Sequence, residues 1–219
     1  MRRLLLDRNA MDTQRPIETL ALLGEPLCLE FSNTASLHEY DGERGDRLLA
    51  YEDLVAWSRR VGTLDAGAAE ALNMEARRRP REAERVFAEA TALRESIFRL
   101  MRAAEDGAPL PAADLERLNG WAARALSHRV LVPAEGGGVE WRWPAPGGAL
   151  EAPLWPVAES AASLLSSPEL GRVKSCGAED CEWLFLDTSR NRSRRWCDMS
   201  ECGNRVKARR HYARRKSEG

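Results

Sequence analysis

The chain has 219 residues, of which 43% are hydrophobic and 31% are charged. This composition is typical of a globular protein, and the length suits one sizeable domain with a small additional module. No apolar run approaches the roughly 20 residues of a membrane-spanning helix, which excludes a membrane-embedded class of protein. The opening residues hold only a few leucines between charged residues, too few for a signal-peptide core of about 7–15 apolar residues. We therefore expect a cytoplasmic protein whose thiols stay reduced.

The net charge of −1 conceals an uneven distribution of charged residues. Residues 1–169 carry 20 Lys and Arg against 27 Asp and Glu, a balance of −7, whereas residues 170–219 carry 13 against 7, a balance of +6. A basic segment on an acidic body indicates that the C-terminal segment alone meets a polyanion.

The N-terminal region divides into an irregular part and an apolar part. Residues 1–18 show no clear periodicity, and we expect a flexible arm. The alternation of Leu27, Leu29 and Phe31 with other residues predicts a strand. Cys28 has no partner nearby, and we expect a small residue of the core there.

Apolar residues that recur at three- and four-residue steps predict the helices of the body. Asp65 is placed to cap one of them. In the longest one Arg94 lies close to the apolar stripe, so we expect it to be partly buried and paired; in the next we expect Leu126 to face inward. The polar residues 38–46 before these helices predict a loop. The expected helices span residues 51–61, 66–77, 80–105, 112–126 and 157–166.

Two short β-type runs, residues 130–132 and 139–143, flank three glycines and predict a hairpin. Alternation places Trp141 and Trp143 on one face, where exposed rings could stack bases. Only Arg142 is basic nearby, and it points the other way, so we expect the tryptophans to pack in the sheet. The body is therefore expected to be α+β, mostly helical with a small antiparallel sheet.

Four of the five cysteines form two pairs with equal four-residue gaps. Two close pairs joined by a short segment are the pattern of a tetrahedral zinc site, and four thiolates leave no open position on the metal. Two disulfides would need an oxidising compartment, and unrelated buried thiols would not fall into matched pairs. The sequence predicts one structural zinc ion, held by Cys176, Cys181, Cys197 and Cys202.

Basic residues crowd around the second cysteine pair. A strand over 182–186 is expected to cover the zinc, with Trp183 and Phe185 on one face, and a helix from about 202 to 215 is expected to follow a cap by Ser200 or Asp198. Such a helix suits phosphates and a major groove, although a merely solvated face is the alternative. The candidate nucleic-acid contacts are Arg190, Arg192, Arg194, Arg195, Asn204, Arg205, Lys207, Arg209, Arg210 and Arg214.

Two residues of this segment have competing interpretations. Asn204 could read adenine in a groove, but beside Gly203 at a helix start it is expected to hydrogen-bond the backbone of the zinc knuckle. Gly203 is expected to allow close packing against the thiolates. Trp196, next to a ligand, is expected to be partly buried.

The C-terminal segment resembles the CGNR zinc finger in the runs WLFLD at 183–187, SR at 189–190, RWC at 195–197 and CGNR at 202–205. Asp198 stands where that pattern has Ser. Upstream, EFSNT at 30–34, YEDLVAW at 51–57 and LN at 118–119 resemble the ABATE domain that precedes such fingers. The resemblance implies an ABATE-like α+β domain over 19–167 and a small treble-clef-like or ribbon-like finger over 168–219.

Proteins of this arrangement are regarded as stress-induced transcription regulators, so the resemblance implies a DNA-binding finger and a body that senses a signal or forms a dimer. Asn33 and Thr34 match the short motif and are the candidates for a ligand pocket; a turn capping a strand end is the alternative. A homodimer is one of the two alternatives for the body, because a single small finger binds weakly and a paired site multiplies affinity.

Two other classes of function remain open from the sequence. The same basic helix could bind RNA or a protein, with the zinc as a structural element. An enzyme is less favoured, because none of the three histidines lies in a metal or nucleophile motif and no phosphate loop is present. His38 with its acidic neighbours fits a surface loop better than a polar site, so we expect no catalysis.

Overall fold

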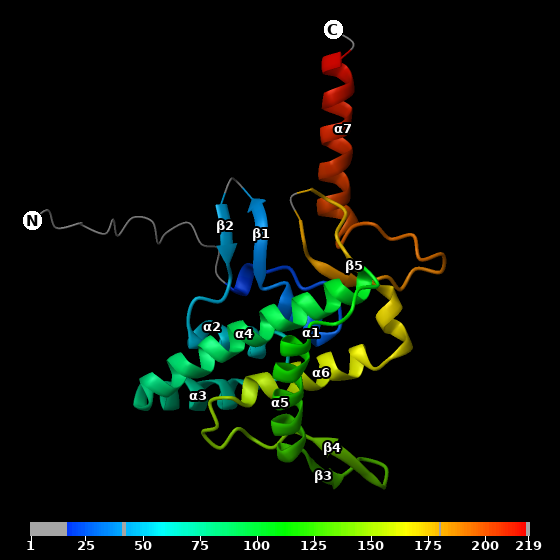
Figure 1. The fold of residues 1–219 in the computed structure, drawn as a ribbon. Coiled ribbons are helices and arrows are strands. Elements are labelled where there is room, and N and C mark those ends of the chain that lie inside the picture. Colours follow the sequence, from blue (N-terminus) through cyan, green and yellow to red (C-terminus); the bar gives the residue numbers. More distant parts are fainter. Residues whose placement is uncertain (1–16, 41–42, 180, 218–219) are drawn as a thin grey trace, which may run out of the picture.

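The computed structural model describes residues 17–40, 43–179 and 181–217. A helical body carries the cysteine-rich finger at one end, and the last helix points away from both (Figure 1). This arrangement confirms the α+β class, with small antiparallel hairpins beside the helices. The expected flexible arm lies outside the described residues up to position 16, after which a short 3-10 helix, η2 (Ile17–Thr19), begins the described chain with Ile17 buried.

The strand predicted at residues 27–31 is wrong, because this segment is helix α1 (Leu27–Ser32). Pro26 precedes it, and the residues from Cys28 to Ser32 are buried on every side of the helix. A short segment buried all round has no polar face, so its apolar pattern does not distinguish helix from strand. Cys28 is a core residue as expected, and burial raises the pKa of its thiol to about 11.

The loop predicted at residues 38–46 is also wrong in part. Strands β1 (Ala35–Tyr40) and β2 (Glu43–Asp46) form an antiparallel hairpin with Ala35 opposite Asp46. A strand pair held by its backbone ladder can carry polar side chains, which is why composition indicated a loop.

The periodic segments are helices with nearly the predicted bounds: α2 (Tyr51–Arg60), α3 (Ala66–Arg78), α4 (Pro80–Glu105), α5 (Ala112–His128) and α6 (Trp155–Leu165). The carboxylate of Asp65 accepts from the backbone N–H of Ala68 at 2.7 Å, which confirms the predicted cap. Leu126 is 63% exposed, so its inward assignment is wrong: in the last turn of α5 the neighbouring Ala125 is the buried residue and His128 stacks on Trp155, which leaves Leu126 on the solvent side.

Arg94 connects the longest helix to the first hairpin. Its side chain is 2% exposed and donates to the carboxylate of Asp46, with one Nη1···Oδ1 distance of 2.7 Å, and to the Thr34 hydroxyl at 3.1 Å. The expectation that Arg94 is buried and paired is confirmed, and its partners lie on β2 and just after α1.

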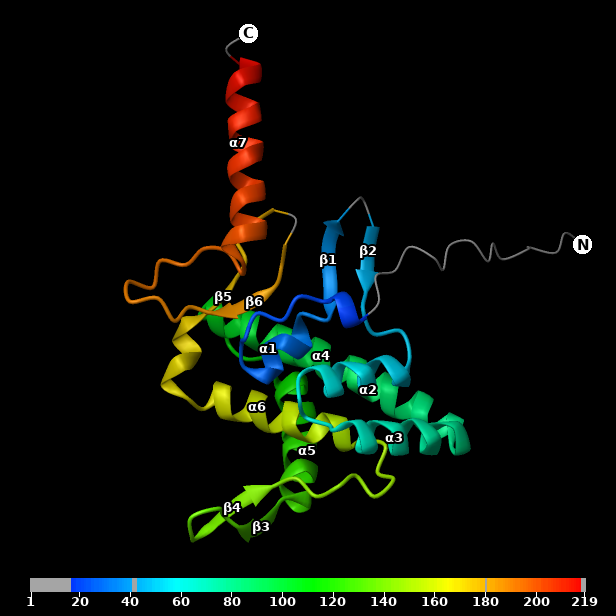
Figure 2. The same cartoon turned by 180° about the vertical axis from the view of Figure 1, so that it is seen from behind.

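The second hairpin, β3 (Val130–Pro133) with β4 (Val139–Arg142), forms where predicted, with Leu131 opposite Trp141. It lies at the end of the body opposite the finger (Figure 2). Trp141 is 55% exposed, so the expected packing is wrong for this ring, whereas Trp143 is half-buried near Trp155. Alternation specifies which side chains share a face, but not whether another element covers it.

The finger shares its core with the body. After the 3-10 helices η3 (Ala152–Leu154) and η4 (Pro168–Arg172), strands β5 (Val173–Ser175) and β6 (Leu184–Leu186) pair in antiparallel fashion. One face of β6 places Phe185 among the cysteines, while Leu184 and Leu186 pack with Val173 in the core of the body. The chain passes from the body into the finger at η4, near residue 168, but the hydrophobic core of the body continues into the strands of the finger.

In the part of the chain that the structure describes, none of the helices has the length and apolar character needed to cross a bilayer.

Candidate metal centre and basic helix

The four predicted ligands meet at one point. Cys176 follows β5, Cys181 precedes β6, and Cys197 and Cys202 come from the segment before the last helix. All four are buried, and their sulfur atoms lie within 4.8 Å of one another. Tetrahedral Zn–S bonds of about 2.3 Å require sulfur separations of about 3.8 Å. The observed distances of 3.6 Å from Cys181 to Cys197 and 3.5 Å from Cys197 to Cys202 fit one zinc ion.

Backbone hydrogen bonds hold the two cysteine pairs together. The N–H of Gly177 donates to the carbonyl of Arg195 at 2.8 Å, and the N–H of Cys197 donates to the sulfur of Cys176 at 3.4 Å. A Cβ atom on Gly177 would lie 3.0 Å from the Arg195 carbonyl oxygen, so the close approach favours glycine. Hydrogen bonds from the other thiols, first Cys181, lower the pKa of Cys176, whereas the hydrogen bonds with Cys176 raise the pKa of Cys181 and of Cys197.

The helix that follows begins with an irregular turn. Asp198 accepts from the N–H of Ser200 at 2.6 Å, and its hydrogen bonds with Ser200, first that of the hydroxyl, lower the pKa of Asp198, which confirms the predicted cap. Residues Met199–Gly203 then form a π-helical turn, η5, so the regular helix α7 (Asn204–Ser217) begins slightly later than predicted.

The CGNR residues have structural contacts. The amide of Asn204 donates to the Ser200 carbonyl at 2.9 Å, as the backbone interpretation expects. The Nη2 atom of Arg205 donates to the sulfur of Cys202 at 3.3 Å, and the guanidinium brings positive charge to the thiolates. The expectation for Gly203 is wrong: an added Cβ would lie 2.5 Å from the sulfur of Met199, so the glycine makes room for that side chain, which folds back over the turn.

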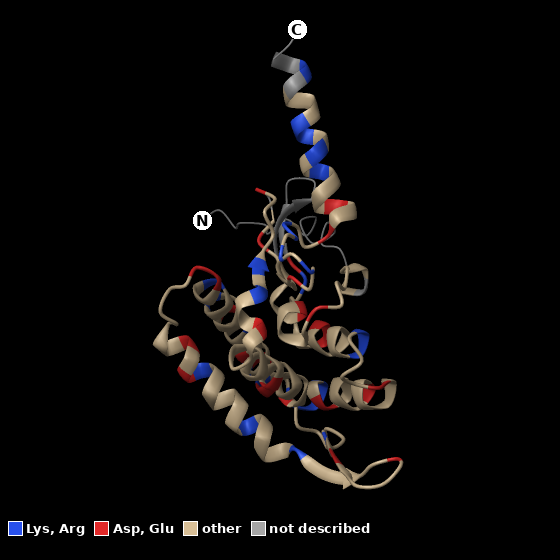
Figure 3. Cartoon of the chain, turned by 90° about the vertical axis from the view of Figure 1, so that its right-hand side faces the viewer, with Lys and Arg blue, Asp and Glu red and all other residues tan. Residues whose placement is uncertain are grey.

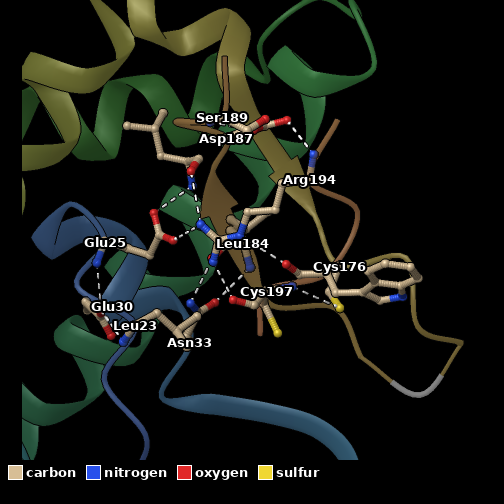
Figure 4. Close-up of polar contacts among 12 residues, drawn as sticks. Leu23, Glu25, Glu30, Asn33, Cys176, Leu184, Asp187, Ser189, Arg194 and Cys197 are labelled. Atoms are coloured by element: carbon tan, nitrogen blue, oxygen red, sulfur yellow. Dashed lines mark hydrogen bonds and ion pairs between the residues drawn. The ribbon is translucent and has the colours of Figure 1, made fainter. Parts of the chain in front are cut away.

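Arg194 has a different role from the predicted nucleic-acid contact, because its guanidinium is directed into the protein (Figure 4). It lies over the ring of Phe185, 4.4 Å from the centroid, and forms an ion pair with Glu25 of the body at 2.9 Å. Its other acceptors are backbone carbonyl oxygens of the finger, on Leu186, Trp196 and Cys197. The sequence could not distinguish this arginine from its neighbours, since Glu25 is remote in the chain.

Asp187 is a structural residue that the sequence alone did not single out. It is fully buried and accepts from Lys174 at 2.5 Å and from the N–H of Ser189 at 3.0 Å. Burial would raise the pKa of Asp187, but these hydrogen bonds outweigh it and lower the pKa to about 2. A buried carboxylate beside the zinc knuckle thus organises the basic loop that follows.

Asn33 and Thr34 lie at the contact between body and finger. The Asn33 side chain accepts from the N–H of Leu184 and donates to its carbonyl, both at 2.9 Å. Thr34 donates to the Phe31 carbonyl at 2.7 Å and accepts from Arg94. Their exposures of 2% and 0% leave no surface for a ligand, so the predicted ligand pocket is not formed by this pair. The turn of the alternative interpretation is present at residues 33–34, but it ends helix α1 and not a strand.

A buried carboxylate holds the segment that reaches the finger. Glu30 accepts from the N–H groups of Leu23 and Glu25 at 2.8 and 2.9 Å, and burial raises the pKa of Glu30. Glu25, fixed in this way, accepts from the N–H of Leu186 at 2.7 Å and from Arg194 (Figure 4).

The remaining basic residues form the outer surface of the finger. Lys and Arg follow one another along α7, which extends away from the body (Figure 3). Trp196 is half-buried as expected. Arg214 belongs to α7, but its side chain lies outside the described residues, as does that of His38 in β1. The exposed candidates are Arg190, Arg192, Arg195, Asn204, Lys207, Arg209 and Arg210.

Four clustered cysteines and a basic helix define a zinc-finger protein. The chain belongs to the ABATE family, described as "Putative stress-induced transcription regulator", whose model matches residues 25–168, more than half of the chain. The model of the CGNR zinc finger matches residues 172–215. Both matches agree with the resemblance found in the sequence and with its order. None of the curated proteins compared with the chain matches it.

Proposed function

We propose that this protein is a DNA-binding transcription regulator in which α7 and the basic loop before it contact duplex DNA. The observation that carries this proposal is the position of α7, a 14-residue helix that extends from the finger (Figure 3) and carries the exposed cations Lys207, Arg209, Arg210 and Arg215. The N-terminal body would sense a small-molecule signal or form a homodimer, and we expect no catalysis.

The dimensions of α7 support contact with a groove. At 1.5 Å per residue its 14 residues span about 21 Å, and the major groove of DNA, about 12 Å wide, admits one helix. The zinc ligands and the Asp198 cap hold η5, from which α7 continues, so the helix is presented in a defined direction.

The composition of α7 favours a polyanion over an apolar partner. The exposed residues of α7 include the cations Lys207, Arg209 and Arg210. Its apolar residues Ala208 and Tyr212 are exposed as well. An exposed helix without an apolar face gains little from packing on another protein. Phosphates, in contrast, would neutralise the repulsion among its cations and release counterions.

The test is a salt titration of binding with the full-length, zinc-loaded chain, because the finger shares its core with the body. The ligands are duplex DNA, single-stranded RNA and a neutral polymer. Duplex DNA is expected to bind best, with an affinity that falls steeply as salt rises. A preference for single-stranded RNA would support the RNA-binding alternative. If neither nucleic acid binds at low salt, the remaining alternative is a module that binds another protein.

A pair of variants assigns the binding to α7. Lys207→Ala with Arg210→Ala removes two exposed cations and should reduce the salt slope by about 2, at about 0.9 per phosphate contact. Arg77→Ala with Arg78→Ala removes the same charge from exposed positions at the end of α3. If this control loses as much affinity as the α7 variant, the binding is non-specific attraction to the whole protein and the proposal fails.

A further inference from the structure

A cavity of about 570 Å³, widely open to solvent, lies where the N-terminal segment of the body meets the finger. This volume is within the range of about 300–1,000 Å³ that small-molecule sites occupy. Three segments form its walls: the body segment 22–23, residues 189 and 193–195 of the basic loop, and the segment 196–199 around the zinc ligand Cys197. A molecule in this cavity would therefore contact the body and the finger together.

One part of the cavity wall is apolar. Leu22 is 36% exposed and Met199 is 47% exposed, and both line this cavity with the half-buried ring of Trp196. A ligand group seated between them would remove apolar surface from water on both sides. The flat indole favours an aromatic group, which can pack against the ring at low entropic cost.

The polar part of the wall offers one cation. Arg194 forms an ion pair with Glu25, and the carboxylate of Asp198 accepts the hydrogen bonds that cap η5. Arg195 is exposed, with its guanidinium 5.7 Å from the centroid of the Trp196 ring. Among the described residues that line the cavity, Arg195 is the charged group without a carboxylate partner, and the exposed Ser193 lies beside it.

We propose that this cavity binds a small molecule in which an aromatic or apolar group carries one anionic group, such as a carboxylate. The apolar part lies between Leu22, Trp196 and Met199, and the anion is bound by Arg195. This inference deepens the sensing part of the proposed function and names a site for it. It does not depend on DNA binding.

The position of the cavity gives the ligand a way to act on the finger. It contacts the body through segment 22–23, which Glu30 holds in place, and the finger through the residues on either side of the zinc ligand Cys197. Because the complete cavity exists only while the two are in contact, the ligand stabilises that arrangement.

The experiment compares two probes on the full-length, zinc-loaded chain by isothermal titration calorimetry: 1-naphthoate and its neutral analogue 1-naphthalenemethanol. Naphthoate is expected to bind with 1:1 stoichiometry. Arg195→Ala should weaken naphthoate about tenfold or more, the value of a hydrogen bond to a charged group, and should leave the neutral analogue nearly unchanged. No saturable binding of naphthoate to the wild-type protein would overturn the proposal.

Two further variants test whether naphthoate binds in this cavity or is attracted by the positive charge of the whole loop. Arg190→Ala removes the same charge from an exposed position of the same loop, outside the cavity wall. It should leave naphthoate affinity unchanged, although both arginine variants should lower the DNA salt slope similarly. Leu22→Asp, on the body side and away from the zinc, should weaken naphthoate as strongly as Arg195→Ala. Equal naphthoate affinity in Arg190→Ala and Arg195→Ala would exclude the site, whatever the DNA result.

Discussion

At the scale of single residues, Asn33 makes the most specific contact between body and finger. Its amide donates to and accepts from the backbone of Leu184, which is the pairing that a neighbouring strand would make. Only an amide side chain offers one donor and one acceptor in this geometry. The residue that the short N-terminal motif indicated as a ligand contact thus recognises the finger of the same chain.

Asn33→Asp should destabilise the protein by about 2 kcal/mol or more, because the carboxylate has no donor for the Leu184 carbonyl and would be buried beside it. Chemical unfolding followed by circular dichroism measures the change. Asn119→Asp, at an exposed position of α5, is the matched control and should shift the unfolding free energy by less than about 0.5 kcal/mol. Equal effects of the two substitutions would show that the Asn33 contact adds no stability.

Asp187 gives a pH dependence of defined sign. Its pKa is lowered from the ordinary value of 3.8 to about 2 in the folded protein. A lowered pKa means that the folded state favours the ionised form, so its contribution is complete above about pH 4 and is lost as pH falls toward 2.

Asp187→Asn should therefore destabilise the protein at neutral pH by about 1–3 kcal/mol, through the weakened hydrogen bonds of Lys174 and Ser189. The difference in unfolding free energy between wild type and variant should narrow as pH falls from about 4 to about 2. A difference that is constant over this range would contradict the assigned pKa.

At the scale of elements, the tertiary contacts that stabilise α7 are concentrated at its first turn. Its main contacts in the described chain are with η5, and Val206 is half-buried beside the cysteines. A helix of this length is marginal in water on propensity alone, and its repeated cations repel one another. Bound phosphates would favour the helical form.

Ala208→Gly in α7 should lower the affinity for DNA about fivefold, because glycine costs about 1 kcal/mol in a helix interior. The melting temperature of the body should not change, since Ala208 is exposed and packs on nothing there. Fluorescence anisotropy with labelled duplex DNA measures the affinity. An unchanged affinity would indicate that the bound form of this segment is not helical.

At the scale of the whole molecule, the strands beside the zinc site contribute to the hydrophobic core of the body. The strand pair that carries the first two cysteines inserts Leu184, Leu186 and Val173 into the core of the body. Polar contacts from Asn33 and Glu25 add to this packing. Loss of the metal frees this strand pair, so it should weaken the helices of the body as well as the finger.

Removal of zinc with a chelator should lower the melting temperature of the helices in a single transition, measured by far-ultraviolet circular dichroism, and re-addition should restore it. Cys197→Ser should behave like the metal-free protein and should not respond to zinc. A chain ending at residue 206 keeps all four ligands and should melt like the wild type. An unchanged transition of the body after zinc removal would show that the two parts are independent.

The sequence alone predicted the zinc ligands and the long helices, because both depend on spacing along the chain. Cysteines separated by four intervening residues can reach one metal, and apolar residues at helical steps bury one face of a helix whatever element covers it. Only the tertiary structure decided the helical form of α1, the exposure of Trp141 and the roles of Asn33 and Arg194. Their partners are remote in the chain, 151 residues from Asn33 to Leu184 and 169 from Glu25 to Arg194. No local pattern encodes such contacts, since they exist only once the finger packs on the body.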